Sequence, residues 1–143
     1  MTAEALFSIS NLMAGLAWLL LIVAGRLQRV ADLITGAIVP LLLSVLYAGL
    51  IVTVWPTAEG GFSSIREVRS LFANDWLLVA GWVHYLAFDL FIGSWQVRDA
   101  RKHGIPHLAL IPGLILTFFF GPIGLLVYTA IRSWRSRTLT LAE

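Results

Sequence analysis

Four long apolar stretches constrain the fold of this chain more than any other feature. They cover residues 7–25, 33–55, 76–97 and 108–131. Each is as long as the roughly 18 or more apolar residues that mark a bilayer-spanning helix. Hydrocarbon cannot satisfy backbone polar groups, so such segments must fold as helices. The sequence therefore predicts an all-α integral membrane four-helix bundle, with residues 1–143 forming a single transmembrane domain.

The composition agrees with a multi-pass membrane protein. Hydrophobic residues make up 59% of the chain and charged residues 13%, whereas soluble domains are about 45–50% apolar and about 25% charged. Cysteine is absent, which excludes disulfides, thiolate nucleophiles and thiolate-bound haem or iron–sulfur clusters. We expect no cofactor.

The basic residues lie at the helix ends and form no single patch, so nucleic acid is not an expected partner. Five Lys and Arg residues flank the two short connections, and five lie in the long connection and the C-terminal segment. The positive-inside rule compares the number of Lys and Arg residues on the two sides of the membrane. Because the two numbers are equal here, the rule assigns no orientation. Dual topology and a homo-oligomer both remain open.

The connection between the second and third stretches contains a second helical pattern, over residues 62–74. Its apolar and charged positions alternate at helical spacing: Phe62, Ile65, Val68, Leu71 and Phe72 against Arg66, Glu67 and Arg69. This pattern predicts a short amphipathic helix in the membrane interface, serving as a tether or as a lid. Ser63 or Ser64 with Glu67 would form a capping box, and Asn74 or Asp75 would cap the next helix.

Asp89 lies in the middle of the third stretch, where an ionisable side chain is costly and indicates a functional site. We expect this carboxyl to be protonated and to act as a hydrogen-bond donor or a general acid. A purely structural hydrogen bond between helices is the alternative.

His84 is the nearest histidine, but five residues at about 100° each place it about 140° around the helix from Asp89. A His–Asp pair within this helix is therefore disfavoured, and Asp89 must find its partners on other helices. The candidate partners are Asn11, Ser44, Tyr47, Thr117 and Tyr128.

Aromatic and small residues on the four stretches could line a hydrophobic groove suited to an isoprenoid, although ordinary packing explains many of them. The candidate substrate-binding residues are Asn11, Trp18, Tyr47, Trp82, Tyr85, Phe88, Trp95, Phe120, Gly121 and Tyr128. Pro112 and Pro122 break or kink the fourth stretch, and the sequence GPIG leaves backbone carbonyls free near the core.

His103 and His107 have the i, i+4 spacing of a metal-binding pair. Gly104 and Pro106 lie between them and disfavour a helical presentation. His84 lies toward the opposite side of the membrane. These histidines are therefore weak metal candidates, and we expect no metal site.

The segment WVHYLAFDLFIGSW at 82–95, the IPH tripeptide at 105–107 and FGPIGLLVY at 120–128 carry a family resemblance. They resemble the abscisic-acid-deficient membrane proteins of plants, which are needed for neoxanthin synthesis, and their bacterial relatives. The resemblance implies a four-helix membrane protein that binds or converts a carotenoid or other isoprenoid lipid. Because the chain is compact and no plastid transit segment is expected, we expect a bacterial inner membrane.

The reaction implied by the resemblance converts violaxanthin to neoxanthin, which opens an epoxide and removes a carbon-bound proton to form an allene. This chemistry needs an acid and a base but no redox cofactor. The resemblance implies that Asp89 is the acid and His84 a base or an orienting group, with Trp82, Tyr85 and Trp95 along the polyene. The substrate could equally be another carotenoid, an apocarotenoid or a quinone.

Three functions follow from these expectations. The first is an intramolecular isomerase that acts on a xanthophyll-like or apocarotenoid lipid by acid–base epoxide opening or double-bond rearrangement. The second is a non-catalytic carotenoid or lipid carrier. The third is a small proton-coupled transporter, with which a membrane-embedded carboxyl is compatible.

Overall fold

The computed structural model describes residues 1–136, and these residues form helices and connecting loops without strands. Among these described residues, three helices are long and apolar enough to cross a membrane. They are α1 (Ala3–Ala24), the continuous helix Val30–Thr57 and α4 (Asp75–Lys102). The first three predicted spans are therefore confirmed as helices, with ends that differ by a few residues.

The second helix changes its geometry along its length. It begins as the π-helix η1 (Val30–Ile38), continues as α2 (Val39–Val54) and ends in the 3-10 turn η2 (Trp55–Thr57). A π-helical turn is wider than an α-helical turn, and such turns are rare and frequently lie at functional sites. Thr35 lies in η1, and its hydroxyl donates to the Val30 carbonyl at 3.0 Å, five residues earlier.

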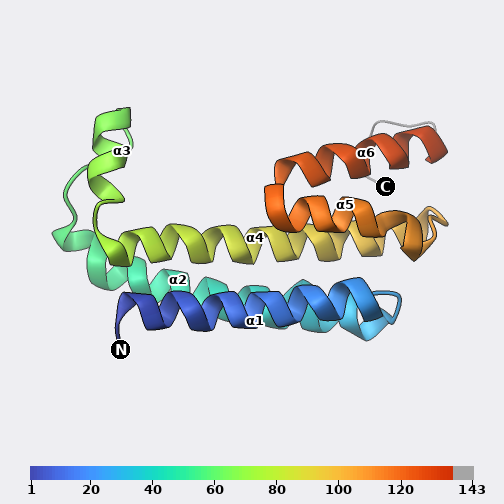
Figure 1. Cartoon of the computed structure of the whole chain (residues 1–143), viewed down its shortest axis with the longest axis horizontal. Coiled ribbons are helices and arrows are strands. Elements are labelled where there is room, and N and C mark those ends of the chain that lie inside the picture. The colour runs from blue at the N-terminus through green and yellow to red at the C-terminus, as the bar shows by residue number, and fades with distance from the viewer. Residues whose placement is uncertain (137–143) are drawn as a thin grey trace.

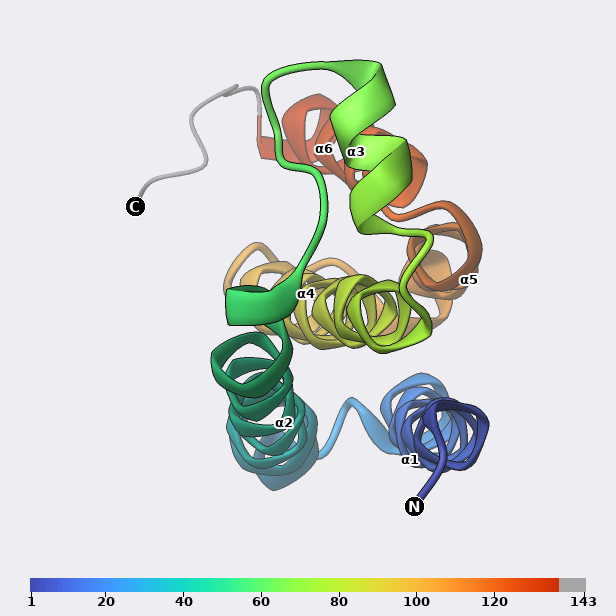
Figure 2. The ribbon, with the colours of Figure 1, turned by 90° about the vertical axis from the view of Figure 1, so that its left-hand side faces the viewer.

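The central helix of the structure is α4. Figure 2 shows α1 and α2 on one side of it and the two C-terminal helices on the other. One hydrophobic cluster includes Trp18, Leu90 and Leu114, and a second includes Leu43 and Val83. Because α4 contributes to both clusters, it connects the two sides of the molecule.

The fourth predicted helix, over residues 108–131, is wrong as a single span. The chain instead forms α5 (His107–Phe120) and α6 (Pro122–Ser136), and α6 turns back beside α5 (Figure 1). Gly121 separates them at φ +40°, a left-handed conformation that favours glycine. The 14 residues of α5 reach about 21 Å, which is less than the roughly 30 Å hydrocarbon core.

The hairpin also needs a close approach between its two helices. A Cβ atom at Gly124 would collide with the backbone and hydroxyl of Thr117. Glycine at 124 therefore lets α6 pack directly on α5. Within residues 1–136 the chain forms three long helices and a helical hairpin, so the expected four-helix bundle is not confirmed.

The long connection contains α3 (Ile65–Leu71), inside the predicted segment 62–74. Ser64 accepts a hydrogen bond from the Glu67 backbone amide at 3.2 Å, and Glu67 accepts one from the Ser63 amide at 3.1 Å. The Asn74 side chain accepts one from the Trp76 amide at 2.9 Å. These bonds confirm the predicted helix starts.

The hairpin changes the distribution of charge between the two ends of the molecule. In Figure 1, both short connections and the end of α6 lie at one end, and the N-terminus and α3 lie at the other. Within residues 1–136, all Lys and Arg residues except Arg66 and Arg69 lie at the first end. We call it the basic end: Arg26, Arg29, Arg98, Arg101, Lys102, Arg132 and Arg135. The even division expected from four spans is therefore wrong for these residues.

The absence of native cysteine allows a direct test of the hairpin. We expect single Gln28→Cys and Trp134→Cys variants to react with a membrane-impermeant maleimide from the same side of the membrane. Ser63→Cys should react from the opposite side, because α4 crosses between it and the basic end. Labelling of Trp134→Cys from the Ser63 side would instead show that the fourth stretch spans the bilayer.

Candidate functional site

The carboxyl group of Asp89 lies against the turn between α5 and α6. A Cβ atom built on Gly121 would lie 2.9 Å from Asp89 Oδ1 and 3.0 Å from Oδ2. Asp89 Oδ2 is buried and has no hydrogen-bond partner. Asp89 is about 21 Å along α4 from Asp75 at 1.5 Å per residue. The structure thus places an unsatisfied carboxyl oxygen deep in a membrane-spanning helix, beside a break in another helix.

Tyr85 lies one turn before Asp89 and connects it to the end of α5. The Tyr85 hydroxyl donates to the Phe118 carbonyl at 2.8 Å. Carbonyls in the last turn of a helix lack an intrahelical partner, so this bond stabilises the end of α5. Tyr85 and Asp89 also interact electrostatically. The phenol therefore borders the carboxyl.

A groove of about 390 Å³ lies beside this pair, between α1, α4 and α5. Its lining residues are Asn11, Ala14, Trp82, Tyr85, Leu86, Phe118 and Phe119. The Trp82 indole donates to Asn11 Oδ1 at 2.7 Å, and the Trp82 and Tyr85 ring centroids are 5.2 Å apart. Tyr85 lines the groove and also borders Asp89, so the groove lies next to the residue that neighbours the carboxyl.

Several predicted site residues lie on the other side of α4. The His84 ring is 5.4 Å from Tyr47 on α2 and 4.7 Å from Phe88, measured between centroids. Asp89 instead faces Gly121, between α5 and α6. The expectation that His84 and Asp89 do not form a pair is confirmed.

The remaining predicted site residues pack against other side chains or are exposed. Trp18 is buried in the core, 5.5 Å from the Phe118 ring. Trp95 packs against Tyr128, also at 5.5 Å. Phe120 is exposed. The structure therefore brings together Asp89, Tyr85, Trp82, Asn11 and Gly121, and adds the groove residues Phe118 and Phe119.

The predicted polar partners of Asp89 are wrong. Asn11 accepts from Trp82, Ser44 donates to the Pro40 carbonyl, Thr117 accepts from Gln96, Tyr128 donates to Asp99, and Tyr47 packs on His84. The neighbours of Asp89 are instead Tyr85 on its own helix and the Gly121 backbone. For Thr117 and Tyr128 the physical reason is the break at Gly121, which puts the turn itself against Asp89.

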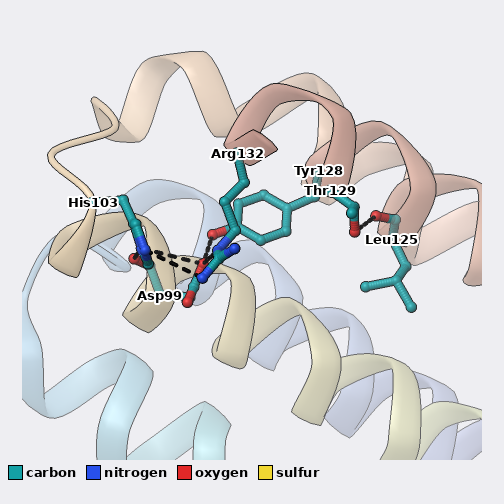
Figure 3. A network of polar contacts seen from close by, with 6 residues as sticks. All are labelled: Asp99, His103, Leu125, Tyr128, Thr129 and Arg132. Carbon is teal, nitrogen blue, oxygen red and sulfur yellow. Dashed lines mark hydrogen bonds and ion pairs between the residues drawn. The ribbon is translucent and has the colours of Figure 1, made fainter. Parts of the chain in front are cut away.

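A second polar cluster lies at the basic end, around Asp99 (Figure 3). Asp99 Oδ2 accepts a hydrogen bond from the Tyr128 hydroxyl and one from Arg132 Nε at 2.7 Å. His103 Nδ1 lies 2.8 Å from the Asp99 carbonyl, and His103 Nε2 lies 3.2 Å from Arg132 Nη2. The Arg132 side chain is only 2% exposed. This cluster connects the last turns of α4 to α6.

The sequence interpretation did not identify the Asp99 cluster. Asp99 and Arg132 are 33 residues apart and meet only because α6 turns back. The spacing of Asp99 and His103, one helical turn apart, was the only local signal for it. With one continuous fourth helix, Arg132 would lie across the membrane from Asp99.

The weak metal candidates have other contacts. His103 belongs to the Asp99 cluster, and His107 Nε2 lies 2.8 Å from the Ile22 carbonyl at the end of α1. Among residues 1–136, no group of three His, Asp or Glu side chains converges on a common point. Within this range, the structure therefore offers no preformed metal centre.

The chain was compared with known protein families, curated proteins and solved structures. A family model described as ABA DEFICIENT 4-like matches residues 5–128, which include Asp89, its groove and the turn at Gly121. No curated protein and no solved structure matches the chain.

From the Asp99 cluster we predict how two substitutions change the free energy of unfolding. Arg132→Ala should lower the free energy of unfolding by about 3–5 kcal/mol, because it leaves a buried carboxylate without its cation. Arg135→Ala, on the exposed side of the same helix, should change it by less than about 0.5 kcal/mol. Unfolding titrations in mixed detergent measure the free energy of unfolding of both variants. Equal decreases in the two variants would contradict a stabilising role of the Asp99–Arg132 ion pair.

Proposed function

Because the chain belongs to the ABA DEFICIENT 4-like family, we propose that it is a membrane-embedded isomerase of a carotenoid or related isoprenoid. Family membership and the three long apolar helices indicate a membrane protein associated with the carotenoid and abscisic acid pathway. The proposed location is a bacterial inner membrane. The proposed site is the carboxyl of Asp89 at the end of the aromatic groove.

The observation that supports this site most strongly is the unsatisfied Oδ2 atom of Asp89. A buried polar atom without a partner is costly, and such atoms occur where a ligand or a reaction uses them. Within residues 1–136, the ion pairs that the structure contains do not involve Asp89. A protonated carboxyl, able to donate to a substrate oxygen, fits this environment.

The groove suits one end of an elongated apolar substrate. Its volume of about 390 Å³ is within the range of small-molecule sites. Trp82 and Phe119 line it and are 40% and 62% exposed, so the groove opens toward the surrounding lipid. A lipophilic ring could enter sideways from the bilayer, with its polyene extending out between the helices.

The proposed chemistry is an epoxide opening without a net change in composition. The Asp89 carboxyl gives its proton to the epoxide oxygen as one carbon–oxygen bond breaks. The neighbouring carbon–hydrogen bond supplies the electrons of the new double bond, and its proton passes to the other carboxylate oxygen. Asp89 is regenerated in its protonated form, so one carboxyl with two oxygens supplies both the acid and the base.

This scheme changes the role of His84 that the resemblance implies. His84 packs against Tyr47 and Phe88 on the α2 side, so Tyr85 is the better orienting group beside Asp89. The Tyr85 hydroxyl borders the carboxyl and could contact the same substrate oxygen.

A carotenoid or lipid carrier is the second candidate, because a groove that opens to lipid also suits reversible binding. The carrier would release its ligand chemically intact. Both candidates share the groove and differ in whether Asp89 transfers a proton.

The isomerase is tested with the purified protein, reconstituted in lipid and supplied with violaxanthin. We expect an allenic product of unchanged mass, and a rate in Asp89→Asn that is lower by about 10²- to 10⁴-fold. Asparagine keeps the shape of the side chain but cannot transfer the proton. His84→Gln, on the other face of α4, should keep the wild-type rate.

Chromatography with absorption and mass detection separates the possible results. A polyene that binds and remains unchanged in the wild-type protein would reject the isomerase and support the carrier. An equal rate of conversion in Asp89→Asn would reject Asp89 as the acid. An absence of polyene binding in both proteins would reject both functions.

A further inference from the structure

A second groove lies on the opposite side of α4, against η1 and α2. It has a volume of about 380 Å³ and an almost entirely apolar lining: Gly36, Ala37, Pro40, Leu41, Ser44, Ala87, Phe88 and Phe91. Gly36, Ala37 and Ala87 leave the space open because their side chains are small or absent, and Phe88 and Phe91 form a wall. This groove shares no lining residue with the one beside Asp89.

One end of this groove meets the guanidinium of Arg98. Arg98 Nη1 donates to the Ala31 carbonyl in η1 at 2.9 Å, and its Cζ lies 5.7 Å from the centre of the Phe91 ring. A Cβ atom at Gly36 would collide with Arg98 Nη1. Gly36 and Phe91 therefore line the groove and also contact the cation at its end.

Beyond Arg98 lies a shallow hollow of about 440 Å³ that is open to its surroundings and bounded by polar side chains, which we call the polar cavity. It is bounded by Gln28, Asp32, Arg98, Arg101 and Lys102. Asp32 is the single acidic residue among them and forms an ion pair with Arg101. Because Asp32 is paired with Arg101, the Arg98 guanidinium adds positive charge to this lining. Arg98 belongs to this cavity and contacts two residues of the apolar groove, so the two spaces are adjacent.

The position of the polar cavity matches the headgroup region of a membrane. Arg98 is about 6 Å from Lys102, the last residue of α4, at 1.5 Å per residue. The cavity thus lies where a spanning helix leaves the hydrocarbon. The basic end also contains Arg26, Arg29, Arg132 and Arg135. The positive-inside rule assigns such an end to the cytoplasmic side, where anionic lipids attract clustered Lys and Arg residues.

We propose that these two spaces form one binding site for an anionic phospholipid of the cytoplasmic leaflet. One acyl chain lies in the apolar groove of α2 and α4, and the phosphate lies among Arg98, Arg101 and Lys102. The planar guanidinium groups suit phosphate oxygens. The widened turn of η1 contributes the Ala31 carbonyl that orients Arg98. The site is independent of Asp89 and of the isomerase reaction.

Native mass spectrometry of the full-length protein tests the site. With added phosphatidylglycerol or phosphatidylcholine of identical chains, we expect the wild-type protein to retain more phosphatidylglycerol. Arg98→Gln and Arg101→Gln should each reduce that retention about fivefold, the effect of one charge at the membrane surface. Ala37→Phe should reduce it by filling the apolar groove without changing any charge.

Arg69→Gln is the matched control, because Arg69 is an exposed arginine of α3 at the other end of the molecule. It should retain phosphatidylglycerol as the wild-type protein does. If Arg98→Gln aggregates during gel filtration, Arg101→Gln and Ala37→Phe still decide the outcome.

Three results would overturn the proposed site. The first is equal retention of the two phospholipids by the wild-type protein. The second is wild-type retention of phosphatidylglycerol by Ala37→Phe and Arg101→Gln. The third is release of phosphatidylglycerol by equimolar inorganic phosphate or farnesyl phosphate, which would identify a free phosphate or an isoprenyl phosphate as the better ligand.

Discussion

The turn at Gly121 is the constraint on which the rest of the structure depends. Its left-handed φ and the proline that follows it end α5 before it can cross a bilayer. Because Gly121 has no side chain, the Asp89 carboxyl can lie against the backbone there. Because α6 returns along α5, Arg132 reaches Asp99. A continuous helix would remove the carboxyl site, the buried ion pair and the basic end together.

The features that could be predicted from the sequence are those determined by neighbouring residues. Hydropathy identified three spans, the Ser64–Glu67 capping box identified the start of α3, and helical periodicity separated His84 from Asp89. The prolines and glycines of 112–124 indicated a break or a kink. The apolar run 108–131 nevertheless favoured a fourth span, because hydropathy alone does not distinguish a spanning helix from a hairpin in the membrane.

The features that could not be predicted depend on the direction of the chain after Gly121. The partners of Asp89, the Asp99–Arg132 pair and the distribution of charge between the two ends all change when α6 turns back. The two faces of α4 then have separate chemistry. Toward α1 and α5, Tyr85 lines an aromatic groove and borders Asp89. Toward η1 and α2, Arg98 lies at the end of an apolar groove.

The central claim is that the Asp89 carboxyl acts on an isoprenoid held in the groove beside it. Absorption and mass spectra of the pigment that co-purifies in gentle detergent from a carotenoid-producing host test this claim most directly. We expect a bound polyene in both the wild-type and the Asp89→Asn proteins, with a rearranged isomer only in cells that express the wild type. Preparations of both proteins that contain no polyene would contradict the claim.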